Sequence, residues 1–250
     1  MSKMKVLVAG SALGAAILAG PAAAAVTGTV AATSEYTFRG ITSSDGAAVQ
    51  GSLDWSDGGL YAGIWGSNTA PLVFDGTEVD LYGGYKFKLS DAVEVDIGAI
   101  YYLFPESEQI SASAFDADYP EIYGGVNLGN FSAKLYYASK YFGELSADES
   151  ATYLNLAYNM PLKDTLGLKF AVGYSDGDGV ENFFDLLDDG ALNASAETQD
   201  YLDYSITLTK TLDNGFAASF GLVGTDIDDS SLDFNDDPKF VVTLSKGFEI

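Results

Sequence analysis

The 250-residue sequence contains neither cysteine nor histidine. Without cysteine, no disulfide can stabilise the fold, even in an oxidising compartment. Without histidine, the Ser–His and Asp–His arrangements used by many hydrolases are unavailable, which argues against an enzyme. The carboxylate pairs Glu78/Asp80 and Glu94/Asp96 remain as acid–base candidates, but a polar wall is the simpler interpretation of both. We therefore expect no catalytic residues and no cofactor.

Basic residues are scarce. The chain has 36 acidic residues against 12 basic ones and a formal net charge of −24 at pH 7, which disfavours nucleic acid as a partner. Most of the acids fall in the predicted long loops, where two interpretations stay open. One is a solvated, repulsive surface. The other is a weak divalent-cation site at Asp226, Asp228, Asp229 and Asp233, in a segment that lacks the glycine of an EF-hand loop.

Long apolar runs are absent beyond residue 25, and no stretch there approaches the roughly 18 apolar residues of a membrane helix. Residues 1–25 carry Lys3 and Lys5, an apolar stretch at 6–19 and small residues at 21–25. This order predicts a secretory signal peptide, with an N-terminal membrane anchor as the alternative. Residues 26–250 contain no linker or composition break, so we expect one domain.

Residues 26–248 show alternating polarity in about twelve short segments, each near the length of a membrane-crossing strand. The short connections lie near 57–59, 89–92, 129–130, 162–165 and 213–215, and the long ones near 39–48, 67–77, 104–119, 140–151, 175–200 and 225–238. This rhythm is typical of outer-membrane β-barrels, whose periplasmic turns are short and whose extracellular loops are longer. It predicts an all-β, antiparallel transmembrane barrel of about twelve strands with both termini at the periplasmic end.

Successive side chains of a strand point to opposite faces, so each segment has a lipid face and a lumen face. The first predicted strand, 26–39, places Val26, Val30, Ala32, Tyr36 and Phe38 toward lipid, with Phe38 in an outer aromatic girdle, and Glu35 and Arg39 toward the lumen. The predicted lipid positions carry no charge apart from Lys210 and Lys246 at strand ends. A charge in the middle of the bilayer costs about 2–4 kcal/mol, which explains this exclusion.

The predicted lumen face holds charges of both signs, among small residues. They are Glu35, Arg39, Asp54, Glu78, Asp80, Lys86, Lys88, Glu94, Asp96, Glu121, Lys134, Lys169 and Asp203. Arg39 is expected to pair with Asp54 or another inward acid, either narrowing the path or only steadying the wall. Five inward tyrosines are candidates to contact solutes, or else fill the lumen: Tyr82, Tyr102, Tyr123, Tyr136 and Tyr153.

Several stretches resemble the TorF-type porin family. They are residues 35–40 (Glu-Tyr-Thr-Phe-Arg-Gly), 48–54, 59–65, 78–85, 121–125 and 241–246. The resemblance implies an outer-membrane barrel with a pore and no established substrate. Barrel proteins of this kind usually finish on an aromatic residue, whereas here Phe248 is followed by Glu249 and Ile250.

The sequence therefore favours a channel for passive diffusion of small solutes, with cations preferred because acids outnumber bases on the lumen face. The alternative is a closed barrel with a structural, adhesive or surface-binding role, because twelve strands lie between the filled eight-stranded and the open sixteen-stranded barrels. The expected location is the outer membrane of a Gram-negative bacterium. The expected partners are outer-membrane lipid and lipopolysaccharide, the barrel-assembly machinery and small solutes. The oligomeric state and the solute are left open.

Overall fold

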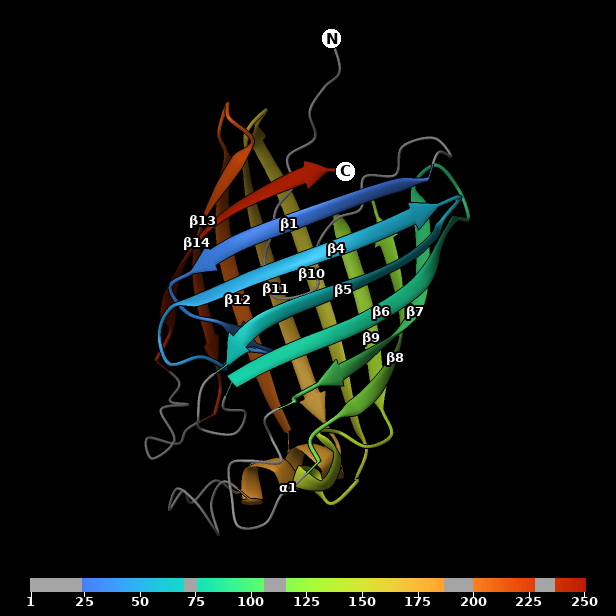
Figure 1. Cartoon of the computed structure of the whole chain (residues 1–250), viewed down its shortest axis with the longest axis vertical. Helices are drawn as coiled ribbons and strands as arrows, with labels where there is room; N and C mark the ends of the chain where they lie inside the picture. Colours follow the sequence, from blue (N-terminus) through green and yellow to red (C-terminus); the bar gives the residue numbers. More distant parts are fainter. Residues whose placement is uncertain (1–23, 70–75, 106–115, 187–199, 228–236) are drawn as a thin grey trace.

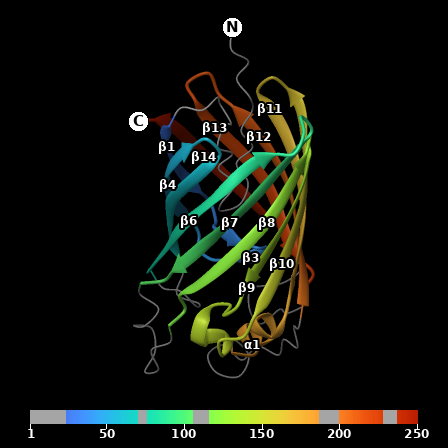
Figure 2. The same cartoon turned by 90° about the vertical axis from the view of Figure 1, so that its right-hand side faces the viewer.

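The computed structural model of the chain describes residues 24–69, 76–105, 116–186, 200–227 and 237–250. In it, strands close into a single antiparallel barrel (Figures 1 and 2). The barrel strands are β1 (Ala25–Thr33), β4 (Ala48–Asp57), β5 (Leu60–Thr69), β6 (Gly76–Lys88), β7 (Val93–Leu103), β8 (Tyr119–Leu128), β9 (Phe131–Ala138), β10 (Ala151–Lys163), β11 (Leu166–Asp176), β12 (Asp200–Thr211), β13 (Phe216–Thr225) and β14 (Lys239–Glu249). The predicted twelve-stranded barrel is confirmed.

Each barrel strand pairs with its neighbours along the chain, and β1 pairs with both β4 and β14 to close the sheet. Thr27 lies opposite Glu249 at one end of this seam, and Thr33 lies opposite Thr243 at the other. Closure gives every barrel strand a partner on both sides. The backbone N–H and C=O groups are thereby hydrogen-bonded within the sheet, which is necessary because lipid offers them no hydrogen-bond partners.

Short turns gather at one end of the barrel and long connections at the other (Figure 1). The β4–β5 turn consists of Gly58 and Gly59, both with positive φ, as a two-residue hairpin turn demands. The first residues of β1 lie beside the last residues of β14 at this short-turn end. The strand ends thus have the arrangement expected of a barrel whose termini share one side of the membrane.

The outer surface is apolar. Large hydrophobic side chains project outward along the strands, for example Val49 (71% exposed), Ile122 (61%) and Ile97 (49%). Exposed apolar area on this scale marks a surface that water does not normally cover, and in a barrel it matches the lipid-facing band. None of the helices in the described part of the chain is long and apolar enough to cross a membrane.

The first predicted strand is wrong beyond residue 33. β1 ends at Thr33, and the chain then turns into the lumen as a small hairpin of β2 (Thr37–Phe38) and β3 (Ile41–Thr42). Arg39 (φ 49°) and Gly40 (φ 84°) form its turn. Figure 2 shows β3 within the outline of the barrel. We call residues 34–47 the inner hairpin.

Two side chains predicted to face lipid therefore face inward. Tyr36 is only 2% exposed and reaches Glu78 of β6, while the Phe38 ring packs edge-on against Tyr102 of β7. The alternation of polarity continues through β2, so its period matches that of a wall strand. The chain leaves the wall at residues 34–36, between β1 and β2, and the period does not reveal this change of direction.

Two short helical elements lie at the loop end: η2 (Gly143–Ser146) and α1 (Asp178–Leu186). They contact each other, and Asn182 of α1 donates a hydrogen bond to the Ser146 carbonyl at 3.2 Å. Residues 181–186 belong to α1, and the side chains of Phe183 and Phe184 on this helix are buried. Residues 187–189 lie outside the described residues.

Candidate functional site: the inner hairpin and its pocket

Arg39, at the tip of the inner hairpin, forms a buried ion pair with Glu121 of β8. Its Nη2 lies 2.7 Å from both carboxylate oxygens, and the two side chains are 6% and 1% exposed. Tyr102 donates a further hydrogen bond to Glu121 Oε2 at 3.0 Å. Burial opposes the charge of Arg39, but the Glu121 carboxylate and the neighbouring tyrosines together hold the pKa of Arg39 above its ordinary value. The expected pairing of Arg39 is therefore with Glu121 rather than Asp54.

Aromatic rings surround the same guanidinium. Its Cζ lies 4.3 Å from the ring centre of Tyr153, 5.5 Å from Tyr136, 5.8 Å from Tyr141 and 4.8 Å from Phe38 of the hairpin itself. All four distances are within cation–π range. We call Glu121, Tyr102, Tyr136, Tyr141 and Tyr153 the Arg39 pocket.

The base of the inner hairpin is tied to the wall at a second acidic position. The Tyr36 hydroxyl lies 3.0 Å from both carboxylate oxygens of Glu78. Asp80, two residues along the same strand, is fully buried, and no donor in the described part of the chain reaches either of its oxygens. Glu35 accepts hydrogen bonds from Thr42 at 2.6 Å and Lys239 at 3.3 Å, which closes the hairpin at its start.

A third group of polar side chains lies farther toward the short-turn end. Tyr61 donates to Asp96 at 2.6 Å and lies 2.5 Å from the Tyr123 hydroxyl. Lys134 lies 3.3 Å from Asp96 and 3.6 Å from the centre of the Tyr123 ring. These contacts join an acid, a base and one tyrosine of the predicted lumen face (Asp96, Lys134 and Tyr123) in one network with Tyr61, which the sequence analysis did not single out.

The remaining predicted lumen residues are distributed along the wall. Asp54 accepts hydrogen bonds from Tyr82 and Ser52, Lys86 lies over the Tyr61 ring, and Asn127 donates to Glu94 at 3.4 Å. Lys169 shares its face of the sheet with buried Thr207, its register partner, and Asp203 is buried beside Tyr153. Lys88 is exposed near the β6–β7 turn. Their role in lining a pore stays a prediction.

The five predicted lumen tyrosines all point inward. Tyr136 packs between Tyr123 and Tyr153, with ring centres 5.5 and 5.8 Å away, so three neighbouring strands present a continuous row of rings. Tyr82 and Tyr102 each bind a carboxylate instead. Solute contact by these five residues remains untested.

The possible divalent-cation site lies mostly outside the described residues, which exclude Asp228, Asp229 and Asp233. Asp226 accepts a hydrogen bond from the Leu202 amide at 2.7 Å, and this contact ties the residue after β13 to the start of β12. Within the described ranges, no three acidic side chains converge in a way that could hold a metal ion.

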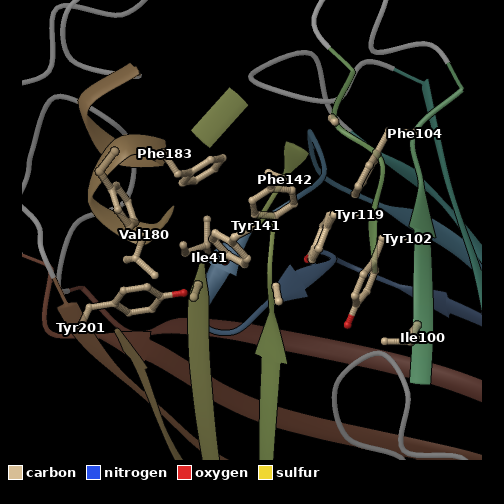
Figure 3. Packing of buried hydrophobic residues seen from close by; sticks show 14 of the residues in the cluster. Ile41, Ile100, Tyr102, Phe104, Tyr119, Tyr141, Phe142, Val180, Phe183 and Tyr201 are labelled. Atoms are coloured by element: carbon tan, nitrogen blue, oxygen red, sulfur yellow. The ribbon is translucent and has the colours of Figure 1, made fainter. Parts of the chain in front are cut away.

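Loop aromatics that the sequence analysis overlooked form a second cluster at the loop end (Figure 3). The Phe142 ring stacks on Phe183 of α1 at 4.8 Å and meets Tyr119 of β8 at 5.0 Å, and Phe184 meets Tyr201 of β12 at 5.7 Å. We call this cluster the aromatic cap; its members are Tyr119, Tyr141, Phe142, Phe183, Phe184 and Tyr201. The sequence does contain an indication of this cluster: the aromatic pairs Tyr141-Phe142 and Phe183-Phe184 stand in otherwise acidic segments.

The aromatic cap is continuous with the inner hairpin. Phe38 of the hairpin packs edge-on against Phe142 at 6.1 Å, and Ile41 belongs to the same buried cluster. The hairpin therefore lies between a polar lumen wall and an apolar assembly of loop residues. Any movement of the hairpin has to break contacts on both sides.

Solved structures with a similar fold include porins. The NanC porin matches with a TM-score of 0.56 and 9% identity, over 87% of this chain and 97% of that one. The KdgM porin matches with a TM-score of 0.54 and 11% identity, over 89% and 99%. The KdgM porin in complex with disordered oligogalacturonate matches with a TM-score of 0.53 and 8% identity, over the same shares.

At these identities the likeness shows the fold, a twelve-stranded barrel of the outer-membrane porin kind. No curated protein matches the sequence. The family match extends over almost all of the barrel, from residue 18 to residue 248. The chain belongs to the family described as "Bacterial protein of unknown function (Gcw_chp)".

Proposed function

We propose that the protein is an outer-membrane channel for passive diffusion of small solutes, that it favours cations, and that the inner hairpin forms its constriction. The observation that carries this proposal is the hairpin itself, held inside the lumen by Arg39–Glu121 at its tip and Tyr36–Glu78 at its base. A segment fastened inside a barrel restricts the path without closing the sheet. Porin-like neighbours of the fold support the same function.

The preference for cations rests on how the lumen charges are paired. Arg39 neutralises Glu121, and Lys134 pairs with Asp96. Glu78 is met by a neutral tyrosine and Asp80 by no donor of the described chain, so this pair has no basic partner there. Whichever carboxyl of the pair is ionised therefore carries a negative charge without a basic partner beside the hairpin, and such a charge between low-dielectric walls raises the local concentration of cations.

Planar-bilayer recording of the refolded protein tests the proposal. Under a KCl gradient we expect a reversal potential that favours K⁺, and a preference that weakens as salt rises, since the screening length is only about 8 Å at physiological ionic strength. The double change Glu78→Gln/Asp80→Asn should lower the preference. Asp164→Asn, in the exposed β10–β11 turn, removes a charge far from the hairpin and should leave it unchanged.

A closed barrel with a structural, adhesive or surface-binding role is the second candidate, favoured by the aromatic cap at the loop end. The two functions differ in one measurement. If neither the native protein nor Arg39→Ala conducts ions after correct refolding, the channel is ruled out and the closed barrel takes its place. A clear anion preference at low salt would instead contradict the proposed selectivity.

We infer that the barrel reaches the outer membrane of a Gram-negative bacterium after export through a cleaved signal peptide at residues 1–25. The apolar outer band would contact lipid and lipopolysaccharide, and the barrel-assembly machinery would insert it. Cell fractionation, with mass determination of the mature N-terminus, tests this proposal: the mature chain should start at Ala25 or Val26 and appear in the outer-membrane fraction.

A further inference from the structure

We propose that the Arg39 pocket is a binding site for the guanidinium group of a transported solute, and that Arg39 occupies it as an internal ligand. This inference rests on the proposed channel function and names its solute class. It begins from the fact that the five pocket residues surround a charged group that belongs to the protein itself.

The pocket is built largely by the wall and not by the hairpin. Tyr102, Glu121, Tyr136 and Tyr153 lie on the consecutive strands β7, β8, β9 and β10, and Tyr141 follows closely after β9. Ladder hydrogen bonds fix these strands relative to one another. The four strand residues of the pocket thus have backbone supports that do not include the hairpin.

The chemistry of the pocket suits a guanidinium. Glu121 offers two carboxylate oxygens, and the Tyr102 hydroxyl holds one of them at 3.0 Å, which fixes the orientation of the acceptor. Tyr136 and Tyr153 present rings to the flat cation, the combination that binds guanidinium by charge-assisted hydrogen bonds and cation–π attraction. A carboxylate buried to this degree is costly to leave unpaired, so the empty pocket should attract a replacement cation.

The internal ligand sits on a segment with few ladder contacts. In the described ranges, β2 and β3 pair with each other and with no barrel strand. Arg39 itself adopts a left-handed backbone conformation (φ 49°) that residues with a side chain rarely take. The tip of the hairpin is therefore held mainly by side-chain contacts, of which the pocket supplies the charged ones. A solute that carries the same group competes directly for them.

The test is chemical rescue of Arg39→Ala by methylguanidinium, with the double variant Arg39→Ala/Glu121→Gln as matched control. Refolding yield and thermal stability in detergent are measured in millimolar methylguanidinium chloride and in NaCl of equal ionic strength. We expect methylguanidinium to raise the stability of Arg39→Ala only, and removal of the Glu121 charge to weaken binding by about tenfold or more. Native protein, whose pocket is filled, should respond much less.

These readouts need no channel current, so they separate the two proposals. Should Arg39→Ala fold poorly in NaCl, its refolding yield with methylguanidinium becomes the measurement. Equal responses of the single and double variants, or equal rescue by NaCl, would overturn the pocket assignment. Rescue without any conductance would support the pocket and defeat the channel. In a conducting Arg39→Ala, methylguanidinium should reversibly lower the current; conductance that methylguanidinium leaves unchanged would argue against a site in the solute path.

Discussion

The Tyr36 hydroxyl lies within hydrogen-bond distance, 3.0 Å, of both carboxylate oxygens of Glu78. This contact ties Tyr36, which precedes the turn of the inner hairpin, to a residue of β6 that lies 42 positions later in the chain. Both side chains are buried. The contact fastens the base of the inner hairpin and satisfies part of an acid that water does not reach.

Tyr36→Phe should therefore destabilise the barrel, because it removes a hydrogen bond to a buried carboxyl group. Such a bond contributes about 0.5–1.5 kcal/mol when both partners are neutral and about 1.5–3 kcal/mol when one is charged. Urea unfolding in lipid vesicles measures the free energy of unfolding. Tyr85→Phe, which removes a hydroxyl from an outward-facing ring, is the matched control and should cost far less. Equal losses for the two variants would show that the Glu78 contact contributes nothing.

Gly40 offers a way to move the hairpin without changing a charge. A Cβ at this position would lie 2.5 Å from Thr225 Cγ2 and 2.7 Å from Asp203 Cβ, and its φ of +84° also disfavours alanine. Gly40→Ala should displace the hairpin tip and raise single-channel conductance. Gly46→Ala has a similar φ of +79° but meets nothing within 4 Å, so it isolates the backbone effect. A conductance change of the same size in both variants would exclude a steric cause.

Two residues on opposite faces of β7, Ile97 and Glu94, should differ sharply in how well the barrel tolerates their substitution. Ile97 points outward and is 49% exposed, whereas Glu94 accepts a hydrogen bond from Asn127 on the lumen side. Ile97→Arg places a charge in the hydrocarbon and should cost about 2–4 kcal/mol near the bilayer midplane. Glu94→Gln should be milder. Folding yield into vesicles measures both, and similar yields would contradict the assigned faces.

Orientation can be measured by cysteine labelling, since the native chain contains no cysteine to give background. Asp148 is exposed in the β9–β10 connection at the loop end, and Asn130 is exposed in the β8–β9 turn at the opposite end. In intact cells a membrane-impermeant maleimide should label Asp148→Cys and spare Asn130→Cys. Labelling of Asn130→Cys alone would invert the barrel in the membrane.

Strand number, turn positions and faces could be predicted because each follows from a strict local period. In β7, Val93 to Leu103 alternate between faces, and the short turn at 129–130 separates two such runs. Lipid excludes charge from the middle of one face of the wall strands, so the register leaves a clear trace in the sequence.

The inner hairpin could not be predicted in the same way. Its direction depends on the left-handed conformation of Arg39 and on contacts with Glu78 and Glu121, which lie far away in the sequence. The sequence did suggest that Arg39 meets an inward acid, but it offered no means to choose among several. The aromatic cap was missed because several of its members do not follow the period of a strand: Phe142 lies in the β9–β10 connection, and Phe183 belongs to the short helix α1.

The seam between β1 and β14 has a consequence for biogenesis. Thr33 and Thr243 share a hydrogen bond across a sequence separation of 210 residues. Contacts this distant form late, because the entropy of closing so long a loop opposes them. Until the last strand arrives, β1 and the growing sheet each present an unpaired edge that invites aggregation. A chain that lacks β14 would keep these edges unpaired, so we expect it to aggregate instead of closing into a barrel.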